Sequence, residues 1–343
     1  MGNILAKSVP IKRKMILGTD WHTDCDDAVA IRILAWAHTH RVVDLLGVSI
    51  DSATEYSVSS LRAFLQCEGI GEVPVAIDHN AYDYEGPARY QPRLAAMETA
   101  PFQNDGCEES LHLYRRLLAG ADEKVDIIEI GFCQVLADLL KSEPDEYSPL
   151  CGLELVRQKV GRLWIMGGDW SREPGKEFNF SYKPKARVAA HEVLALCPVE
   201  VILLGFEAGA DVICGGILGA LSPRDVLYQA MCDWGAEDGR SSWDPLTVYM
   251  ACVGDVQKCG YRLVRGTASV DAQTGENFFD HDPNGKHGYV VKTLADSEYE
   301  RMLNEILLLH SASLAHRVRV PGGGLNAHIY HSISISEGGN GNI

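Results

Sequence analysis

Apolar and polar residues alternate along this chain in two recurring patterns. Short runs rich in Val, Ile and Leu indicate buried strands, and longer segments with apolar residues three and four positions apart indicate amphipathic helices. The expected strands are residues 15–17, 42–50, 73–77, 125–130, 162–166 and 200–204. The expected helices are residues 28–35, 56–67, 109–118, 134–141 and 186–196. Because strands and helices alternate, we predict an α/β fold with an open, mixed, mostly parallel sheet flanked by helices.

The pattern changes toward the C-terminus. Residues 260–291 alternate apolar and polar positions, and Asn284-Gly285 is a hairpin turn signal. His281, Asp282 and His287 lie in this segment, where a solvated hairpin is favoured over a metal site.

No linker rich in Pro, Gly or Ser divides the chain. We therefore expect one domain over residues 15–316, preceded by a flexible N-terminal arm at 1–14. The Ser-, Gly- and Asn-rich residues 317–343 are expected to form a loosely ordered tail.

Most of the candidate chemistry lies directly after the first expected strand. Four carboxylates follow it within eight residues, at Asp20, Asp24, Asp26 and Asp27, and a helical pattern begins next. In open α/β sheets, ligands bind at the carboxyl ends of the strands. An acidic helix N-terminus is the simpler interpretation, but four Asp beside a buried strand favour a site for a hard cation such as Ca2+. An EF-hand is excluded because the loop lacks the turn Gly and the closing Glu.

Composition limits the classes of partner. The 343 residues are 46% apolar, which permits a sizeable core, and the net charge of −16 argues against binding nucleic acid through its phosphates. Ten cysteines without a close CxxC pair fit reduced thiols, so we expect a cytoplasmic protein. No run of about 18 apolar residues predicts a membrane span, and the first fourteen residues lack the apolar core of a signal peptide.

Four short motifs, in order, resemble those of the inosine-uridine preferring nucleoside hydrolase family. The family opens with D-x-D-P-G-x-D-D-A, and this chain matches it at Asp20, Asp26, Asp27 and Ala28. His22, Thr23 and Asp24 stand in place of the second Asp, the Pro and the Gly. The later elements MGG, EFN and (H/W)-D-P-L resemble residues 165–168, 177–179 and 243–246. The resemblance covers roughly residues 15–310.

The resemblance implies hydrolysis of the N-glycosidic bond of a ribonucleoside, with bound Ca2+, by a homo-oligomer. It implies metal ligation by Asp27, Asp244 and the backbone carbonyl of Gln134. The residues it implies for substrate binding are Asp26, Met166, Glu177, Asn179 and Trp243. A purine-specific branch of the family has Trp at the position of Trp243, where the ring stacks on the base, so a purine-like nucleoside is expected.

His22 is the main departure, because the family has an Asp there that ligates calcium and accepts the proton of the attacking water. Imidazole is a poor calcium ligand, which leaves another divalent metal open, and it is a competent general base. Three alternatives follow: Asp24 replaces the missing ligand, His22 is the base with fewer protein ligands on the metal, or metal and hydrolysis are lost. We favour a retained site in which Asp24 or Asp20 compensates. The catalytic candidates are His22, Asp24 and Asp27, and the metal-ligand candidates are Asp20, Asp24, Asp27, Gln134 and Asp244.

Two other classes compete with this interpretation. A phosphatase of the haloacid dehalogenase type needs D-x-D-x-T, but residues 20–23 lack its acid/base Asp. A non-catalytic or weakly active nucleoside or sugar binder is the stronger rival, since His22, Ser171 and Trp243 each replace a functional group of the family. Metal content separates a binder from a hydrolase. Residues 78–99 are expected at the mouth of the site. The possible further walls of the site are His79, Tyr82, Tyr84 and Trp170.

Overall fold

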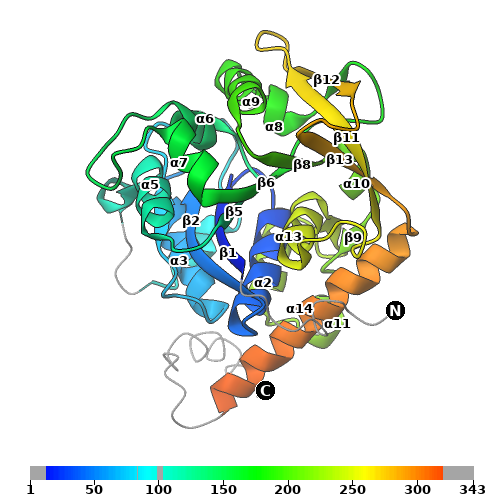
Figure 1. Ribbon diagram of the computed structural model, residues 1–343. Coiled ribbons are helices and arrows are strands. Elements are labelled where there is room, and N and C mark those ends of the chain that lie inside the picture. Colours follow the sequence, from blue (N-terminus) through cyan, green and yellow to red (C-terminus); the bar gives the residue numbers. More distant parts are fainter. Residues whose placement is uncertain (1–12, 83, 99–102, 320–343) are drawn as a thin grey trace, which may run out of the picture.

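A mixed sheet of eleven strands forms the centre of the protein, in the order β4-β3-β2-β1-β5-β6-β8-β13-β11-β12-β7. This computed structural model describes residues 13–82, 84–98 and 103–319 (Figure 1). The parallel part comprises β1 (Arg13–Thr19), β2 (Val43–Ile50), β3 (Val75–Ile77), β4 (Glu108–Glu109), β5 (Val125–Glu129), β6 (Val160–Met166) and β8 (Glu200–Leu204). β13 (His287–Lys292) continues it in parallel, and β11 (Tyr261–Val270), β12 (Glu276–His281) and β7 (Gly175–Lys176) are antiparallel. The expected open, mixed, mostly parallel α/β sheet is confirmed.

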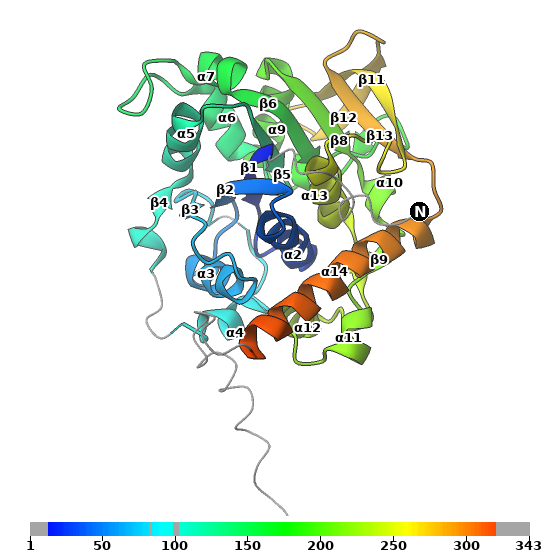
Figure 2. The same ribbon diagram turned by 60° about the horizontal axis from the view of Figure 1, so that its bottom comes forward.

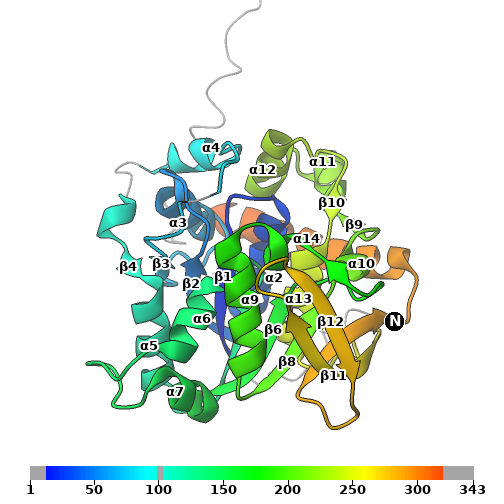
Figure 3. The same cartoon turned by 90° about the horizontal axis from the view of Figure 1, so that it is seen from above.

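Helices cover both faces of the sheet. One face carries α2 (Asp26–Thr39), α3 (Ser57–Cys67), α13 (Trp243–Val253) and α14 (Asp296–Arg319). The other carries α5 (Ser110–Gly120), α6 (Gln134–Lys141), α7 (Gly152–Lys159) and α9 (Pro184–Leu196). Figures 1 and 3 show α9 and α13 on opposite sides of β6 and β8. Shorter elements lie in the loops: α4 (Gln91–Ala95), η1 (Asn104–Gly106), α8 (Phe178–Ser181), α10 (Phe206–Gly209), α11 (Ile217–Leu221), α12 (Val226–Trp234), β9 (Ile213–Cys214) and β10 (Arg240–Ser241).

Successive strand residues enter two different hydrophobic cores. In β6, Leu163 and Ile165 pack on the side of α6 and α9, whereas Trp164 and Met166 pack on the side of α2 and α13. This alternation follows from the two-residue period of a strand, and burial on both faces is typical of parallel sheets. With both faces covered, a ligand reaches the sheet at the ends of its strands.

Helix α2 is buried from Asp26 to Ala37. It lies beneath the sheet with α13 beside it, and α14 crosses the side of the molecule next to it (Figure 2). A helix that is buried on all sides needs a mainly apolar surface all around it. The same packing holds the N-terminus of α2, with its two acidic residues, at the carboxyl end of β1.

The C-terminal strands pair differently from the hairpin expected at Asn284-Gly285. β11 lies between β12 and β13, so this turn connects two strands that are not neighbours. The hairpin turn is instead residues 271–275, where Gly275 has a φ of +73° and the Asp271 carboxylate accepts the N–H of Thr274 at 2.8 Å. His287 accepts the N–H of Ala268 through Nδ1 at 3.0 Å, which gives it a structural partner.

The first and last elements extend beyond their expected bounds. β1 begins at Arg13, inside the arm expected at 1–14, and α14 ends at Arg319, inside the tail expected at 317–343. Residues 1–12 and 320–343 of these two segments lie outside the described residues. Among the helices of the described chain, none combines the length and apolar character needed to cross a membrane.

Candidate active site

A pocket of about 280 Å³ opens at the carboxyl ends of the parallel strands. Its uncharged and acidic polar lining consists of Asp20, Thr23, Asp24, Asp26, Glu177, Asn179 and Asp244. Its aromatic lining consists of Tyr84, Phe178, Phe206, Trp234 and Trp243. Met166 contributes an apolar surface, and Arg240 is a cation among these lining residues. A concave site with aromatic walls and convergent acids is the usual form of a small-molecule pocket.

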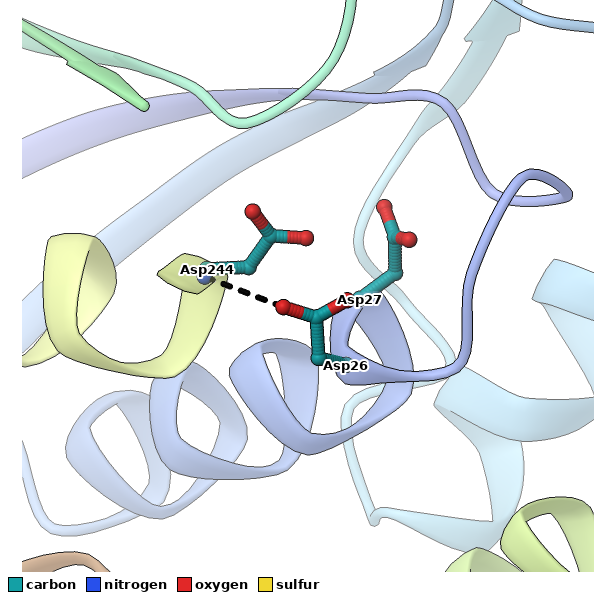
Figure 4. A group of neighbouring side chains, drawn as sticks. All are labelled: Asp26, Asp27 and Asp244. Atoms are coloured by element: carbon teal, nitrogen blue, oxygen red, sulfur yellow. Dashed lines mark hydrogen bonds between the residues drawn. The ribbon is translucent and has the colours of Figure 1, made fainter. Parts of the chain in front are cut away.

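Three buried carboxylates lie close together, those of Asp26, Asp27 and Asp244 (Figure 4). Each offers an oxygen within 4.8 Å of the other two. Asp26 and Asp244 line the pocket, and Asp27 does not. Asp26 and Asp27 occupy the first turn of α2, and Asp244 occupies the first turn of α13. The Asp26 carboxylate accepts the backbone N–H of Asp244 at 3.2 Å, which ties the two helix starts together. Helix N-termini favour negative charge, so both helices support this arrangement.

The charges of this group are not balanced within the protein. Burial raises the pKa of Asp26, Asp27 and Asp244, and the neighbouring carboxylates raise it further. Thr19 donates its hydroxyl to Oδ1 of Asp27, whereas Oδ2 of Asp27 has no hydrogen-bond partner among the described residues. A buried, unpartnered carboxylate oxygen is costly. A donor set made only of carboxylate oxygens fits a hard divalent cation, so these residues suit the metal that the motifs imply.

Asp20 and Asp24 lie beside the three-carboxylate group but are not members of it. Asp20 accepts the hydroxyl of Thr23 at 2.5 Å, and burial raises its pKa to about 7. Asp24 is paired with Arg240, whose Nε donates to both carboxylate oxygens at 3.0 and 3.1 Å. The carboxylate of Asp24 therefore already has a cationic partner.

His22 is buried behind the pocket and does not belong to its lining. Its Nε2 lies 3.0 Å from the carbonyl oxygen of Gly86, and its ring meets Tyr84 edge to face with centroids 4.7 Å apart. Nδ1 has no hydrogen-bond partner within the described chain. Burial lowers the pKa of His22, which favours the neutral imidazole.

Gln134 is the first residue of α6, at the end of the loop that follows β5. Its side-chain amide donates to the carbonyl oxygen of Asp51 at 2.5 Å. This bond joins the loops after β2 and β5.

Met166, Glu177 and Asn179 also line the pocket. Glu177 caps α8: its carboxylate accepts the N–H groups of Gly168 at 3.0 Å and Asn179 at 2.7 Å. Burial raises the pKa of Glu177 to about 7, although these hydrogen bonds oppose the shift. The Asn179 amide donates to the carbonyl oxygens of Ile130 and Met166 at 3.3 Å, so its position is fixed by backbone.

The aromatic wall is centred on Trp243. Its ring stacks with Phe206 at a centroid distance of 5.5 Å and an interplanar angle of 27°, and its Nε1 donates to the carbonyl of Phe206 at 2.8 Å. Of the four further walls considered from sequence, Tyr84 lines the pocket. Trp170 lines a neighbouring cleft of about 250 Å³, His79 lies beside Glu109, and Tyr82 accepts from Asn104.

Two buried acids behind the pocket were missed by sequence reasoning. Asp51 follows β2 and Glu129 ends β5, and their carboxyl groups interact electrostatically. Oδ2 of Asp51 and Oε2 of Glu129 have no hydrogen-bond partner among the described residues. Burial raises both pKa values, that of Glu129 to about 7. Gly18 of β1 leaves room for the pair, since a Cβ there would lie 2.3 Å from a Glu129 oxygen. The sequence signal that could have indicated Glu129 was the presence of an acidic residue inside the mainly apolar run 125–130.

Arg240 was also missed, and its signal was weak. It stands three positions before Trp243 in a segment without a clear apolar period. Its guanidinium lies 5.4 Å from the centre of the Trp243 ring.

Solved structures of nucleoside hydrolases share this fold. The inosine-uridine preferring nucleoside hydrolase from Bacillus anthracis matches with a TM-score of 0.64 at 16% identity, over 88% of this chain and 99% of that one. The purine-preferring ribonucleoside hydrolase from Gardnerella vaginalis matches with a TM-score of 0.64 at 16% identity, over 88% and 99%. The type III effector protein XopQ, solved with adenosine diphosphate ribose, matches with a TM-score of 0.65 at 16% identity, over 90% and 96%. At the level of sequence, neither a protein-family model nor a curated protein matches. The chain therefore has the nucleoside hydrolase fold that its motifs led us to expect, with a divergent sequence.

Proposed function

We propose that this protein is a metal-dependent nucleoside hydrolase that cleaves the N-glycosidic bond of a purine-like ribonucleoside to free base and ribose. The observation that carries the proposal is a group of three buried carboxylates, two of which, Asp26 and Asp244, line an aromatic-walled pocket. Structures that share the fold include inosine-uridine preferring and purine-preferring enzymes, which supports the same reaction class.

Asp26, Asp27 and Asp244 would hold the divalent cation, for which Ca2+ is our first candidate because all three donors are carboxylates. This set differs from the sequence expectation, which had Asp26 on the ribose and had Asp20, Asp24 and Gln134 among the metal ligands. When bound, the cation would compensate the charge of the three carboxylates, bind hydroxyl oxygens of the sugar and lower the pKa of a water molecule.

Asp20 is our candidate for the proton acceptor. In the reaction the bond from C1′ to the base nitrogen breaks with its electron pair leaving on the base, and a water oxygen bonds to C1′. Asp20 lines the pocket close to Asp27, so its carboxylate is placed to accept the proton of that water. His22 is the less favoured base because it does not line the pocket.

The remaining lining residues position the substrate. Asn179 and Met166 lie where the sugar would meet the wall, and the position of Glu177 is fixed by its backbone hydrogen bonds. Trp243 and Phe206 together offer an aromatic surface to a flat base. Stacking of a base on such a surface contributes about 1–3 kcal/mol.

A nucleoside or sugar binder without turnover is the second candidate function. It is favoured by the ion pair between Asp24 and Arg240 and by the burial of His22, which occupy two of the three catalytic candidates. One structural neighbour is an effector protein solved with adenosine diphosphate ribose, which shows that this fold also holds such a ligand.

We also propose that the protein is cytoplasmic and forms a homo-oligomer. All ten cysteines are free, which supports a reducing compartment such as the cytoplasm. A homo-oligomer that binds neither nucleic acid nor membrane remains our prediction, and the molar mass measured by light scattering would test the assembly.

The deciding experiment measures reducing sugar released from purine and pyrimidine nucleosides and from p-nitrophenyl riboside, with added Ca2+ or with EGTA. We expect turnover that EGTA removes, and a loss of at least about 10²-fold in Asp27→Asn and Asp244→Asn. Glu143→Gln, at an exposed position, is the matched control and should keep full activity. Sugar release that survives EGTA, or that survives in both Asp variants, would contradict the site. Binding of nucleosides without any release would favour the binder.

A further inference from the structure

We propose that His22 is a positioning residue that fixes the Tyr84 wall of the pocket. The imidazole would then act on substrate binding, and neither the reacting water nor the metal would contact it. The proposal rests on the hydrolase function above and gives a role to the main departure from the family motif.

His22 makes two contacts with the start of the segment formed by residues 84–91. Nε2 lies 3.0 Å from the carbonyl oxygen of Gly86, and the imidazole meets the Tyr84 ring edge to face, with centroids 4.7 Å apart and an interplanar angle of 87°. A carbonyl oxygen only accepts hydrogen bonds, so Nε2 carries the proton and donates it. Because the side chain is 1% exposed, water does not compete for this bond. His22 is therefore a buried anchor for this segment.

Tyr84 is the part of the segment that reaches the pocket. Its ring lines the pocket and packs against Tyr182 at 5.3 Å and Phe178 at 6.3 Å, measured between ring centroids. A Cβ at position 86 would collide with the Tyr84 ring, so Gly86 allows the ring to lie against the backbone that His22 holds. The position of the Tyr84 wall therefore depends on the bond between His22 and Gly86.

The far end of the segment is held by the same loop that carries His22. The Tyr90 hydroxyl donates to the carbonyl oxygen of Asp24 at 2.9 Å, and the Gln91 side-chain amide donates to that of Trp21 at 2.8 Å. Residues 84–91 are thus attached to residues 20–24 at both ends. His22 supplies the attachment at the end that carries Tyr84, so its loss should release that end while the other stays bound.

The surroundings of His22 argue against a chemical role. Its Nε2 is occupied by Gly86, and its Nδ1 belongs to a side chain outside the pocket lining. His22 is also absent from the three-carboxylate group that would hold the cation. A general base must lie within hydrogen-bond reach of the water that it deprotonates. Asp20 therefore remains the candidate proton acceptor, and His22 positions the wall.

The test separates these roles with two substitutions of His22, assayed on the nucleoside that the wild type hydrolyses fastest. His22→Gln keeps an N–H donor at about the place of Nε2 but has no basic nitrogen, whereas His22→Leu keeps only the bulk. In His22→Leu we expect KM to rise by about 10-fold, because a hydrogen bond and an aromatic contact are lost, and kcat to change by less than about 3-fold. His22→Gln should restore KM to within about 3-fold of the wild type.

Each other role of His22 predicts a different result. A fall in kcat of at least about 10²-fold in both variants would identify a general base, and loss of stabilisation by Ca2+ in both would identify a metal ligand. Either result would overturn the proposal, as would equal KM values in His22→Leu and His22→Gln. His22→Asn, whose amide is too short to reach Gly86, should behave like His22→Leu and replaces it if that variant does not fold, as judged by circular dichroism.

A double variant tests whether His22 acts through Tyr84. Tyr84→Leu should raise KM about as much as His22→Leu, and the double variant should be no worse than either single variant. Additive increases in the free energy of binding would overturn the proposal.

His40→Leu is the matched control. His40 lies at the other end of α2, where its Nδ1 is 2.8 Å from the carbonyl oxygen of Trp36 and its ring stacks on Trp36. Its contacts are thus of the same kind as those of His22 but lie away from the pocket lining. The substitution should leave kcat and KM unchanged.

A measurement without substrate keeps this proposal separate from the hydrolase function. Arg89 is an exposed residue of the segment, and trypsin can cleave after it only when the segment opens. We expect this cleavage to be about 10-fold faster in His22→Leu than in the wild type and His22→Gln, with cleavage after Lys258, in the turn before β11, unchanged. Equal rates after Arg89 would overturn the proposal. If the wild type hydrolyses no nucleoside, the hydrolase function fails, and this comparison decides the role of His22.

Discussion

Two groups of buried charges lie along α2, and they differ in how their charge is compensated. Near the middle of the helix, Arg32 donates to Glu68 at 2.6 and 2.8 Å and to Asp225 at 2.8 Å. His310 of α14 adds a contact to Glu68 at 3.2 Å. Although burial opposes it, Arg32 holds the pKa of Glu68 and of Asp225 below the usual range.

At the start of the same helix, Asp26 and Asp27 face Asp244 with no such cation in their group. Their pKa values are raised by burial and by one another. In the first group the arginine compensates the carboxylates, and the ion pairs join α2, α3, α12 and α14. The second needs protons or an external cation to be stable, which is the expected property of a ligand site.

Removing Arg32 should produce the largest effect, because it would leave two buried carboxylates without their cation. Arg32→Met should lower the free energy of unfolding by about 3–5 kcal/mol, measured by urea denaturation. Arg93→Ala, which breaks an ion pair whose arginine is 53% exposed, should cost less than about 1 kcal/mol. Similar losses in the two variants would show that burial does not distinguish these pairs.

Calcium should act only on the uncompensated group. At a concentration 100 times its Kd, Ca2+ should raise the free energy of unfolding by about 2.7 kcal/mol, measured at pH 8 against EGTA. Asp244→Asn should abolish this gain, and Glu143→Gln should keep it. Stabilisation of Asp244→Asn by the same amount would locate the ion elsewhere.

The pH dependence of stability should sharpen the comparison further, with a smaller effect. Glu129 has its pKa raised from 4.5 to about 7 in the folded protein, so between these values the folded chain retains a proton that the unfolded chain has lost. Its contribution is therefore present below about pH 4.5 and is lost as the pH rises to about 7. In EGTA, Glu129→Gln should remove about 1–3 kcal/mol of this decline. Glu143→Gln should reproduce the wild-type curve, and a Glu129→Gln curve that also does so would refute the assignment.

The sequence determined the local parts of this protein. The run at residues 15–17 and the apolar positions after Asp27 fixed a strand, an acidic loop and a helix, because side-chain periodicity is set by neighbours along the chain. Motif order also singled out Asp27 and Asp244 for one site. These inferences needed no knowledge of distant contacts.

The tertiary structure decided which of these residues meet. Asp24 and Arg240 are 216 positions apart, and no local pattern predicts their ion pair. Asp51 and Glu129 meet because β2 and β5 both pair with β1, and Asp26 joins Asp244 because α13 packs on α2. The order of β12, β11 and β13 likewise depends on which strand edges are available. Hydrophobic periodicity specifies the face that each element buries, whereas strand order and helix packing specify its partners, and the site is assembled from those partners.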